Sequence, residues 1–150
     1  KIMTYNSRLN ENNIDKIIKN YEIIIDGSDN FKTKFLLNLS SLKKRKKLIV
    51  GAISKFEGHV FSFDFRKNKS SCLKCFYQTI PSDDNLNCET DGIIGTVANT
   101  IGSIQANEAI KMILNTGKIL NDSILIFNML NLEFRKVRFT KRIKCICKKF

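Results

Sequence analysis

The first third of the chain alternates between short apolar runs and a segment with helical periodicity. Residues 21–26 and 48–52 are rich in β-branched side chains, which predicts two short buried strands. Residues 31–42 lie between them and repeat apolar side chains at helical spacing, which predicts a helix. The expected apolar face of that helix consists of Phe31, Phe35, Leu36, Leu39 and Leu42. A strand, a helix and a strand in this order are typical of a βαβ unit, so we expect an α/β fold.

The middle of the chain predicts one more strand and a long helix. Residues 59–65 alternate strictly and place three phenylalanines on one face, which predicts an antiparallel partner for 48–52. Residues 94–114 predict a helix that ends before Gly117. Small side chains follow one side of this helix, at Ala98, Gly102, Ala106 and Ala109. Such a strip predicts close packing against another element, either in the core or at an interface between chains.

Both ends of the chain carry shorter elements. Residues 124–128 and 132–139 predict a hairpin of two strands. A shift of the apolar phase between Phe134 and Val137 indicates a bulge in the second of them. Near the other end, three isoleucines within residues 14–18 predict one or two helical turns.

Four of the five cysteines form two close pairs. Cys72 and Cys75 are separated by two residues within a long loop, 66–92, and Cys145 and Cys147 are separated by one residue near the C-terminus. Two thiolate pairs from distant segments supply the four ligands that a structural zinc ion needs. The second pair is one residue shorter than the usual spacing, which leaves open that these are unrelated cysteines of the tail. The pattern favours a structural zinc site with all four positions filled.

Two other features are candidates for chemistry. Residues 26–30 form a polar turn after a strand, and Asp29 lies where ligands bind in open α/β sheets. The position is equally that of a helix cap, so spacing alone leaves both roles open. Cys88 lies in a polar loop and is either a nucleophile that forms a thioester or an incidental cysteine. His59 is the only histidine, which argues against a Ser–His–Asp or Cys–His site.

The composition of the chain indicates which kinds of partner and which cellular compartment to expect. The chain has 150 residues, enough for one domain with a core, and a formal net charge of +12. That charge is compatible with a nucleic-acid partner, but lysine, asparagine and isoleucine share AT-rich codons, and no aromatic residues interleave with the basic run 43–47 to stack on bases. We therefore expect no nucleic-acid partner. No stretch predicts a membrane span or secretory leader, so we expect a cytoplasmic, reducing environment, where close cysteine pairs favour a metal.

These motifs occur together, and in this order, in the MoeB/ThiF adenylyltransferases, which are relatives of ubiquitin-activating enzymes. The segment YEIIIDGSDNFKTKFLLN resembles their strand, turn and helix, and LIVGAISKFEGHVFSF resembles their next pair of strands. The segment from CLKC to ILNTG resembles their first zinc half-site, cysteine-bearing crossover loop and long helix. The resemblance covers residues 15–147. It implies that 1–150 is part of one ThiF/MoeB-like domain, the C-terminal part of a Rossmann-like fold with antiparallel strands and a four-cysteine zinc site.

The resemblance also implies an activity and roles for individual residues. Members of the family use ATP and Mg²⁺ to adenylylate the C-terminal glycine of a ubiquitin-like sulfur carrier, for molybdopterin or thiamine synthesis or tRNA thiolation, and are usually homodimers. By this resemblance, Asp29 is the acidic residue of the (T/S)-D-N motif at the Mg²⁺–ATP site, Asn30 lies beside it, and Lys34 stands where many members have arginine. Cys88 corresponds to the cysteine that takes the carrier as a thioester or acyl-disulfide in many members. The implied zinc ligands are Cys72, Cys75, Cys145 and Cys147.

One part of the family pattern is missing from this sequence. The family has an upstream strand, a G-x-G-x-x-G turn and basic residues that bind the ATP phosphates, and none of them occurs here. We therefore expect that residues 1–150 alone do not adenylylate a carrier, and that the chain is a fragment of the enzyme or the product of a split or decayed gene. The alternative is a non-catalytic, zinc-stapled binding module that has lost ATP chemistry.

Overall fold

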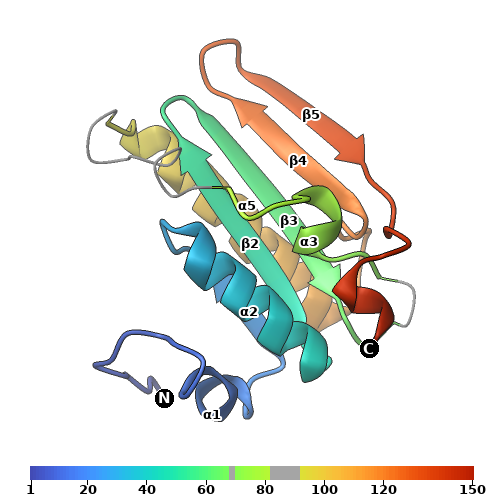
Figure 1. Ribbon diagram of the computed structural model, residues 1–150. Helices are drawn as coiled ribbons and strands as arrows, with labels where there is room; N and C mark the ends of the chain where they lie inside the picture. Colours follow the sequence, from blue (N-terminus) through green and yellow to red (C-terminus); the bar gives the residue numbers. More distant parts are fainter. Residues whose placement is uncertain (68–69, 82–91) are drawn as a thin grey trace.

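A computed structural model describes residues 1–67, 70–81 and 92–150 as one sheet with helices on both of its faces (Figure 1). The five-stranded sheet consists of β1 (Ile23–Asp26), β2 (Lys47–Ser54), β3 (Glu57–Asp64), β4 (Ser123–Asn128) and β5 (Glu133–Arg138). The helices are α1 (Ile14–Ile18), α2 (Phe31–Lys43), α3 (Leu73–Phe76) and α5 (Gly95–Leu114), followed by the 3-10 turn η2 (Ile146–Lys148). The α/β class expected from the sequence is confirmed.

The strands lie in the sheet in the same order as in the chain. Strands β1 and β2 are parallel and are joined by α2, which confirms the predicted βαβ unit. Strand β3 pairs with β2 in antiparallel fashion, as its alternating pattern predicts, and β4 and β5 continue the antiparallel arrangement. Strands β3 and β4 are neighbours although residues 65–122 lie between them, so that α3 and α5 are inserted between two paired strands.

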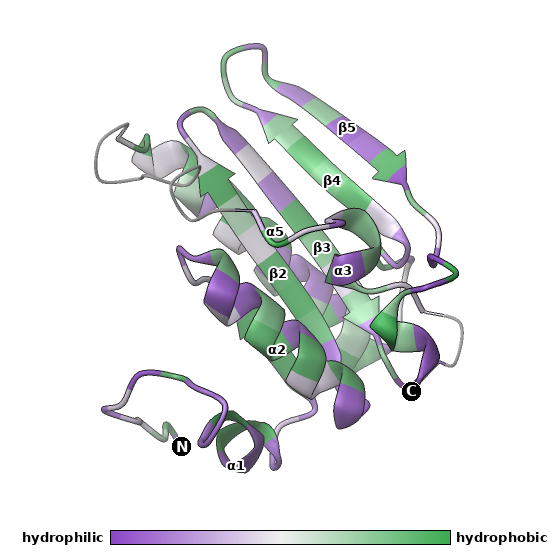
Figure 2. Cartoon of the chain, in the orientation of Figure 1, coloured by the Kyte–Doolittle hydropathy of each residue, from purple (hydrophilic) through white to green (hydrophobic). Residues whose placement is uncertain are grey.

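Alternation along the central strands divides the core into two layers. Phe61 and Phe63 face α2, α3 and the cysteine cluster, on the same side as Leu48. Ile49 and Val60 point to the opposite side, where α5 packs. Figure 2 shows β2 and β4 as mainly hydrophobic, whereas hydrophilic and hydrophobic residues alternate along β5. The sheet therefore forms the middle of three layers, and its central strands are covered on both faces.

Helix α2 buries a broader surface than its apolar pattern predicts. Leu36 and Leu39, expected on the core face, are only partly buried, whereas polar Lys34, Asn38 and Ser41 are buried. One reason is that the polar side chains have specific partners. Asn38, for example, accepts a hydrogen bond from the backbone N–H of Leu73 at the start of α3 (2.9 Å), which helps to hold α3 on α2.

The strip of small residues on α5 does not face the core. Ala98, Gly102 and Ala106 are exposed, and only Ala109 of the strip is buried. The buried side of α5 instead carries Val97, Ile101, Gln105, Glu108, Ala109 and Met112. The prediction of close packing is therefore wrong for the core of the described chain, and an interface with a second copy stays a prediction. Within the described residues, none of the helices has the length and apolar character needed to cross a membrane.

The predicted bulge in the last strand is also absent from the described hairpin. Strands β4 and β5 pair without interruption from Ser123 opposite Arg138 to Asn128 opposite Glu133. All residues of β5 are exposed, so neither of its faces has to be apolar throughout. The phase shift between Phe134 and Val137 thus places one apolar side chain on each face instead of inserting a residue.

Candidate functional site

A tight turn joins the carboxyl end of β1 to the first residue of α2. The Asp26 carboxylate begins it, because its Oδ1 accepts hydrogen bonds from the Ser28 backbone N–H (2.9 Å) and hydroxyl (2.6 Å). Asn30 ends the turn as the N-cap of α2, and its Oδ1 accepts a hydrogen bond from the Thr33 backbone N–H (2.8 Å). The helix is thus capped by Asn30 and not by Asp29, which settles an alternative that spacing left open.

Lys34 fixes this turn from inside the protein. Its side chain is almost fully buried, and its Nζ donates to Asp26 Oδ2 (3.2 Å), the Ser28 carbonyl (2.6 Å) and the Gly51 carbonyl (2.6 Å). These three acceptors come from the end of β1, from the turn and from β2. An ammonium group has three hydrogens, and here all three have protein partners. Lys34 therefore holds the turn against the sheet and has no donor left for a ligand.

The Asp29 carboxylate is the acidic group that this arrangement presents to solvent. Asp29 is exposed, and its Oδ1 accepts a hydrogen bond from Asn30 Nδ2 (3.1 Å). That hydrogen bond, with a smaller contribution from the positive charge of Lys34, lowers the pKa of Asp29, so the group is ionised at neutral pH. Asp29 lines a cavity of about 220 Å³ between the turn, β2 and the N-terminal half of α5. An ionised carboxylate at such a position suits a hydrated divalent cation.

The inner wall of the cavity is formed by a close approach between β2 and α5. The side chain of Gln105 lies against Gly51, where a Cβ would come within 2.6 Å of Gln105 Oε1. The same glutamine donates from Nε2 to the Asp26 carbonyl (2.8 Å). Gln105 thus ties α5 to the end of β1, and Gly51 is the residue that leaves room for it.

Asp26 and Gln105 were missed when only the sequence was considered. Asp26 ends a run that predicts a strand, and Gln105 lies within the long predicted helix. The available signal was their position: both are polar residues within otherwise apolar patterns, and so is Lys34. The Asp26 carboxylate is bound by Ser28 and Lys34, and Gln105 binds the Asp26 carbonyl from a helix distant in the sequence. No spacing rule identifies such partners.

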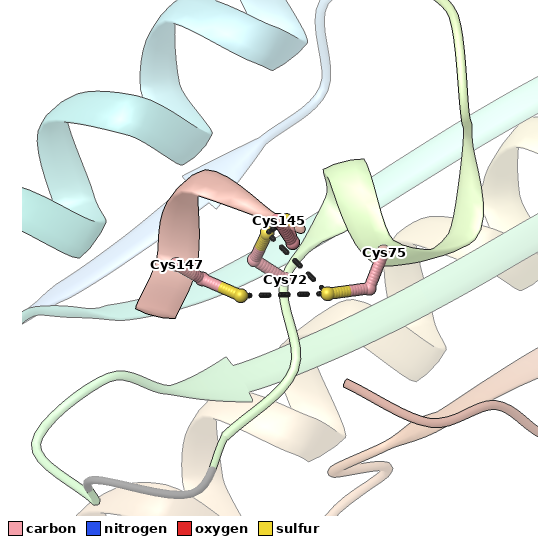
Figure 3. Close-up of side chains that lie close together, drawn as sticks. All are labelled: Cys72, Cys75, Cys145 and Cys147. Atoms are coloured by element: carbon pink, nitrogen blue, oxygen red, sulfur yellow. Dashed lines mark hydrogen bonds between the residues drawn. The ribbon is translucent and has the colours of Figure 1, made fainter. Parts of the chain in front are cut away.

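The four predicted zinc ligands come together at one point between α3 and the C-terminal segment (Figure 3). Cys72 precedes α3 and Cys75 lies within it, and likewise Cys145 precedes η2 and Cys147 lies within it. The Sγ–Sγ distances are 4.0 Å for Cys72–Cys75, 3.6 Å for Cys72–Cys145 and 3.4 Å for Cys75–Cys147. Four sulfurs placed tetrahedrally at about 2.3 Å from zinc would lie about 3.8 Å apart. The short spacing of the second pair therefore does not prevent both thiols from joining the cluster.

The cysteine cluster is buried and its thiols are not joined by disulfides. A hydrogen bond from Cys72 lowers the pKa of Cys75 to about 4, and the same contact raises the pKa of Cys72. Burial raises the pKa of Cys147 to about 12. The contacts and burial of Cys72, Cys75 and Cys147 thus favour the thiolate of Cys75 and disfavour those of the other two, which is the situation that a bound cation reverses. The residues present fit a closed four-sulfur metal site.

The remaining sequence candidates lie elsewhere. Cys88 falls within residues 82–91, outside the residues that the structure describes. His59 is the third residue of β3, partly buried and opposite Ala52 of β2 and Ile126 of β4. Burial lowers the pKa of His59, which favours the neutral ring. His59 is thus a residue of the sheet.

Relatives of this chain were identified by comparison with curated proteins. A probable molybdopterin-synthase adenylyltransferase of Gracilaria tenuistipitata var. liui is 35% identical over 140 residues, which are 91% of this chain and 38% of the relative. The adenylyltransferase and sulfurtransferase MOCS3 of Drosophila virilis is 35% identical over 147 residues, 97% of this chain and 32% of the relative. The chain spans about a third of the length of these curated relatives.

Solved structures show a similar fold at low sequence identity. The crystal structure of E. coli MccB with ATP superposes with a TM-score of 0.76 and 11% identity, covering 96% of this chain and 45% of that one. The structure of MccB with its selenomethionine-labelled MccA peptide gives a TM-score of 0.71. The fold described above is therefore that of part of MccB. The ThiF family matches residues 1–148, nearly the whole sequence, and the chain belongs to the ThiF family.

Proposed function

We propose that this chain is part of an adenylyltransferase that uses ATP and Mg²⁺ to activate the C-terminal glycine of a ubiquitin-like sulfur carrier. The observation that carries the proposal is the Asp29 carboxylate, which is ionised, exposed and not used as a helix cap. It lies at the carboxyl end of a parallel strand, where α/β proteins bind ligands. The two curated relatives reported above are both named adenylyltransferases, which supports the reaction class.

In the proposed reaction, one residue at this site binds the metal ion, and two others position that residue. Asp29 would hold Mg²⁺, which neutralises phosphate charge when it is bound. Asn30 orients the Asp29 carboxylate and starts α2, while Lys34 keeps the turn in place through its three buried hydrogen bonds. The carrier carboxylate would attack the α-phosphate of ATP, forming an acyl-adenylate as pyrophosphate leaves. Lys34 therefore acts on the nucleotide only through Asp29.

The cysteines serve two different purposes in this proposal. Cys72, Cys75, Cys145 and Cys147 would bind zinc with all four positions filled, so the ion is structural and joins the C-terminal segment to α3. Cys88 would attack the acyl-adenylate, forming a thioester as AMP leaves. Replacing Cys88 with serine should then abolish any thiol-sensitive adduct between this chain and the carrier, as measured by gel electrophoresis. An unchanged adduct would remove Cys88 from the mechanism.

Carrier-dependent exchange of pyrophosphate into ATP tests the activity. In the complete gene product that contains residues 1–150, Asp29→Asn should lower exchange on the order of 100-fold. The matched control is Asp15→Asn, because Asp15 is also an exposed aspartate near a helix start but lies on α1 and pairs with Lys44. Equal rates in the two variants would contradict the role of Asp29. Zinc binding without any exchange would instead favour the non-catalytic binding module.

A further inference from the structure

A hollow at the opposite end of the sheet from Asp29 is lined by many basic residues. It has a volume of about 690 Å³ and lies between the C-terminal end of α5, the start of β2 and the end of β5. Eight of its lining residues are lysine or arginine and two are aspartate. The Asp29 cavity involves Gly51 of β2 and the first half of α5, whereas the hollow involves Lys47 and residues 111–118. The two sites are thus separate.

The acidic residues of the hollow leave most of this positive charge uncompensated. Asp64 is bound by the Arg66 side chain, through Nε (2.9 Å) and Nη2 (3.0 Å). Asp122 accepts hydrogen bonds from the Ser71 backbone N–H and from Asn121 Nδ2, both at 2.9 Å. Asp64 therefore offsets one arginine, and Asp122 offsets at most one more of the eight positive charges.

Two of the lysines in the hollow have structural roles at the C-terminal end of α5. Lys111 pairs with the buried carboxylate of Glu108, and its Nζ also donates to the Lys118 carbonyl (2.8 Å). Lys47 is buried and donates from Nζ to the Met112 carbonyl (2.6 Å). Cations are favoured at this end of a helix because its last carbonyls carry partial negative charge. Yet Lys47 has a single such acceptor among the described residues, for an ammonium with three donors.

Four further cations come from segments with no such requirement. Lys67 follows β3, Lys118 lies in the turn after α5, and Lys136 and Arg138 lie on β5. Within the described part of the chain, none of these four side chains has an acidic partner. These four cations are exposed and come from three segments, and gathering them around one concave surface raises the local positive potential, which a bound anion would lower. An AT-rich codon bias accounts for many lysines but not for their gathering here.

We propose that this hollow binds a small ligand that carries two or more phosphate groups. Its volume is within the range of ligand pockets and exceeds what a single phosphate fills. A concave wall concentrates the field of its charges, and the Arg138 guanidinium offers a fork suited to phosphate oxygens. Nucleic acid fits less well, because Phe139, the aromatic residue of the lining, packs against core phenylalanines and is not available for stacking on bases.

Calorimetric titration of the zinc-loaded chain with tripolyphosphate at low salt tests the proposal. The double variant Lys118→Gln with Lys136→Gln should bind at least about tenfold more weakly. The control is Lys16→Gln with Lys19→Gln, which removes the same charge from exposed positions on and beside α1. The control should bind as the unmodified chain does. An equal loss in both variants, or no binding at all, would overturn the proposal.

Two further measurements fix the site and the size of the ligand. On adding tripolyphosphate, changes in amide NMR shifts should concentrate in residues 111–118 and 136–141. Changes confined to residues 26–30 would instead assign the binding to the Asp29 cavity and overturn the proposal. Titration with single-stranded oligouridylate should give weaker binding than tripolyphosphate. Tighter binding of the oligonucleotide, lost in the Lys118/Lys136 variant, would overturn the assignment to a small ligand and favour RNA.

Discussion

Replacing Lys34 with methionine removes the charge that holds the turn after β1 while keeping most of the side-chain volume. The ammonium donates to Asp26 Oδ2 and to the carbonyls of Ser28 and Gly51. Methionine leaves these three acceptors without this donor in a largely buried region. Asp26 Oδ1 keeps both of its hydrogen bonds from Ser28, so the loss falls on the second carboxylate oxygen and the two carbonyls.

The expected loss of unfolding free energy depends more on how deeply the ion pair is buried than on the distance between its charged atoms. Removing one partner of a buried ion pair destabilises a protein by about 3–5 kcal/mol. The pair Lys44–Asp15 has a similar separation of 3.3 Å, but its side chains are 44% and 49% exposed. An exposed pair of this kind contributes about 0–1 kcal/mol. We therefore expect Lys34→Met to lower the free energy of unfolding by at least about 2 kcal/mol more than Lys44→Met does.

Equilibrium unfolding in urea, with the zinc-loaded chain at pH 7, measures both variants. A third variant, Asp26→Asn combined with Lys34→Met, should be less destabilised than the sum of its single changes, because neither charge is then left unpaired. The reasoning would be refuted if Lys34→Met cost no more than Lys44→Met. It would also fail if the changes at Asp26 and Lys34 were additive.

Three other predictions concern the metal, the packing of α5 and the dependence of stability on pH. Cys75→Ser should reduce zinc content, measured by atomic absorption, from about one ion per chain to almost none, and Cys88→Ser should leave it unchanged; equal zinc in both variants would contradict the assignment of ligands. Gly58→Ala should destabilise by about 1–3 kcal/mol, because a Cβ there would lie 2.3 Å from a buried isoleucine of α5. Gly102→Ala, with open space around it, should stabilise the helix by about 0.5–1 kcal/mol, and thermal unfolding that gave both changes the same sign would argue against this packing. Burial lowers the pKa of His59 below 6.5, so the unfolded chain binds more protons as the pH falls through that value, and stability drops; in His59→Gln the decrease in Tm between about pH 7.5 and 5.5 should be smaller, and an unchanged decrease would contradict this.

The elements of this fold follow well from local patterns. The β-branched runs, the helical spacing of α2 and the three alternating phenylalanines of β3 each reflect a side chain packing onto one surface of a sheet. The cysteine cluster was also predictable, because zinc coordination needs particular residue types at short spacing. Where one requirement, such as packing onto a sheet or binding a metal, determines the residues of a segment, the local sequence is enough to predict its structure.

The features that were not predicted depend on partners distant in the sequence. The burial of Lys34 requires carbonyls from the turn and from β2, and that of Glu108 requires the Ser62 hydroxyl and the Leu120 backbone N–H. The exposed strip on α5 was misassigned because small residues fit a tight core and an open surface equally well. Asp29 could be placed at a strand end, but only the geometry shows that Asn30 takes the cap and leaves the carboxylate available.

The pairing of β3 with β4 has a consequence for how the chain folds. Residues 23–64 contain β1, α2, β2 and β3, and β4 with β5 forms a local hairpin, so each of these parts consists of contacts near in sequence. Pairing β3 with β4 closes a loop of residues 65–122, and the chain loses entropy before any new contact compensates for that loss. Until then, the edge of β3 that β4 will occupy presents unpaired backbone groups beside a row of phenylalanines. In a newly made chain, that edge is where a second unfinished copy would pair, so aggregation during synthesis should begin at β3.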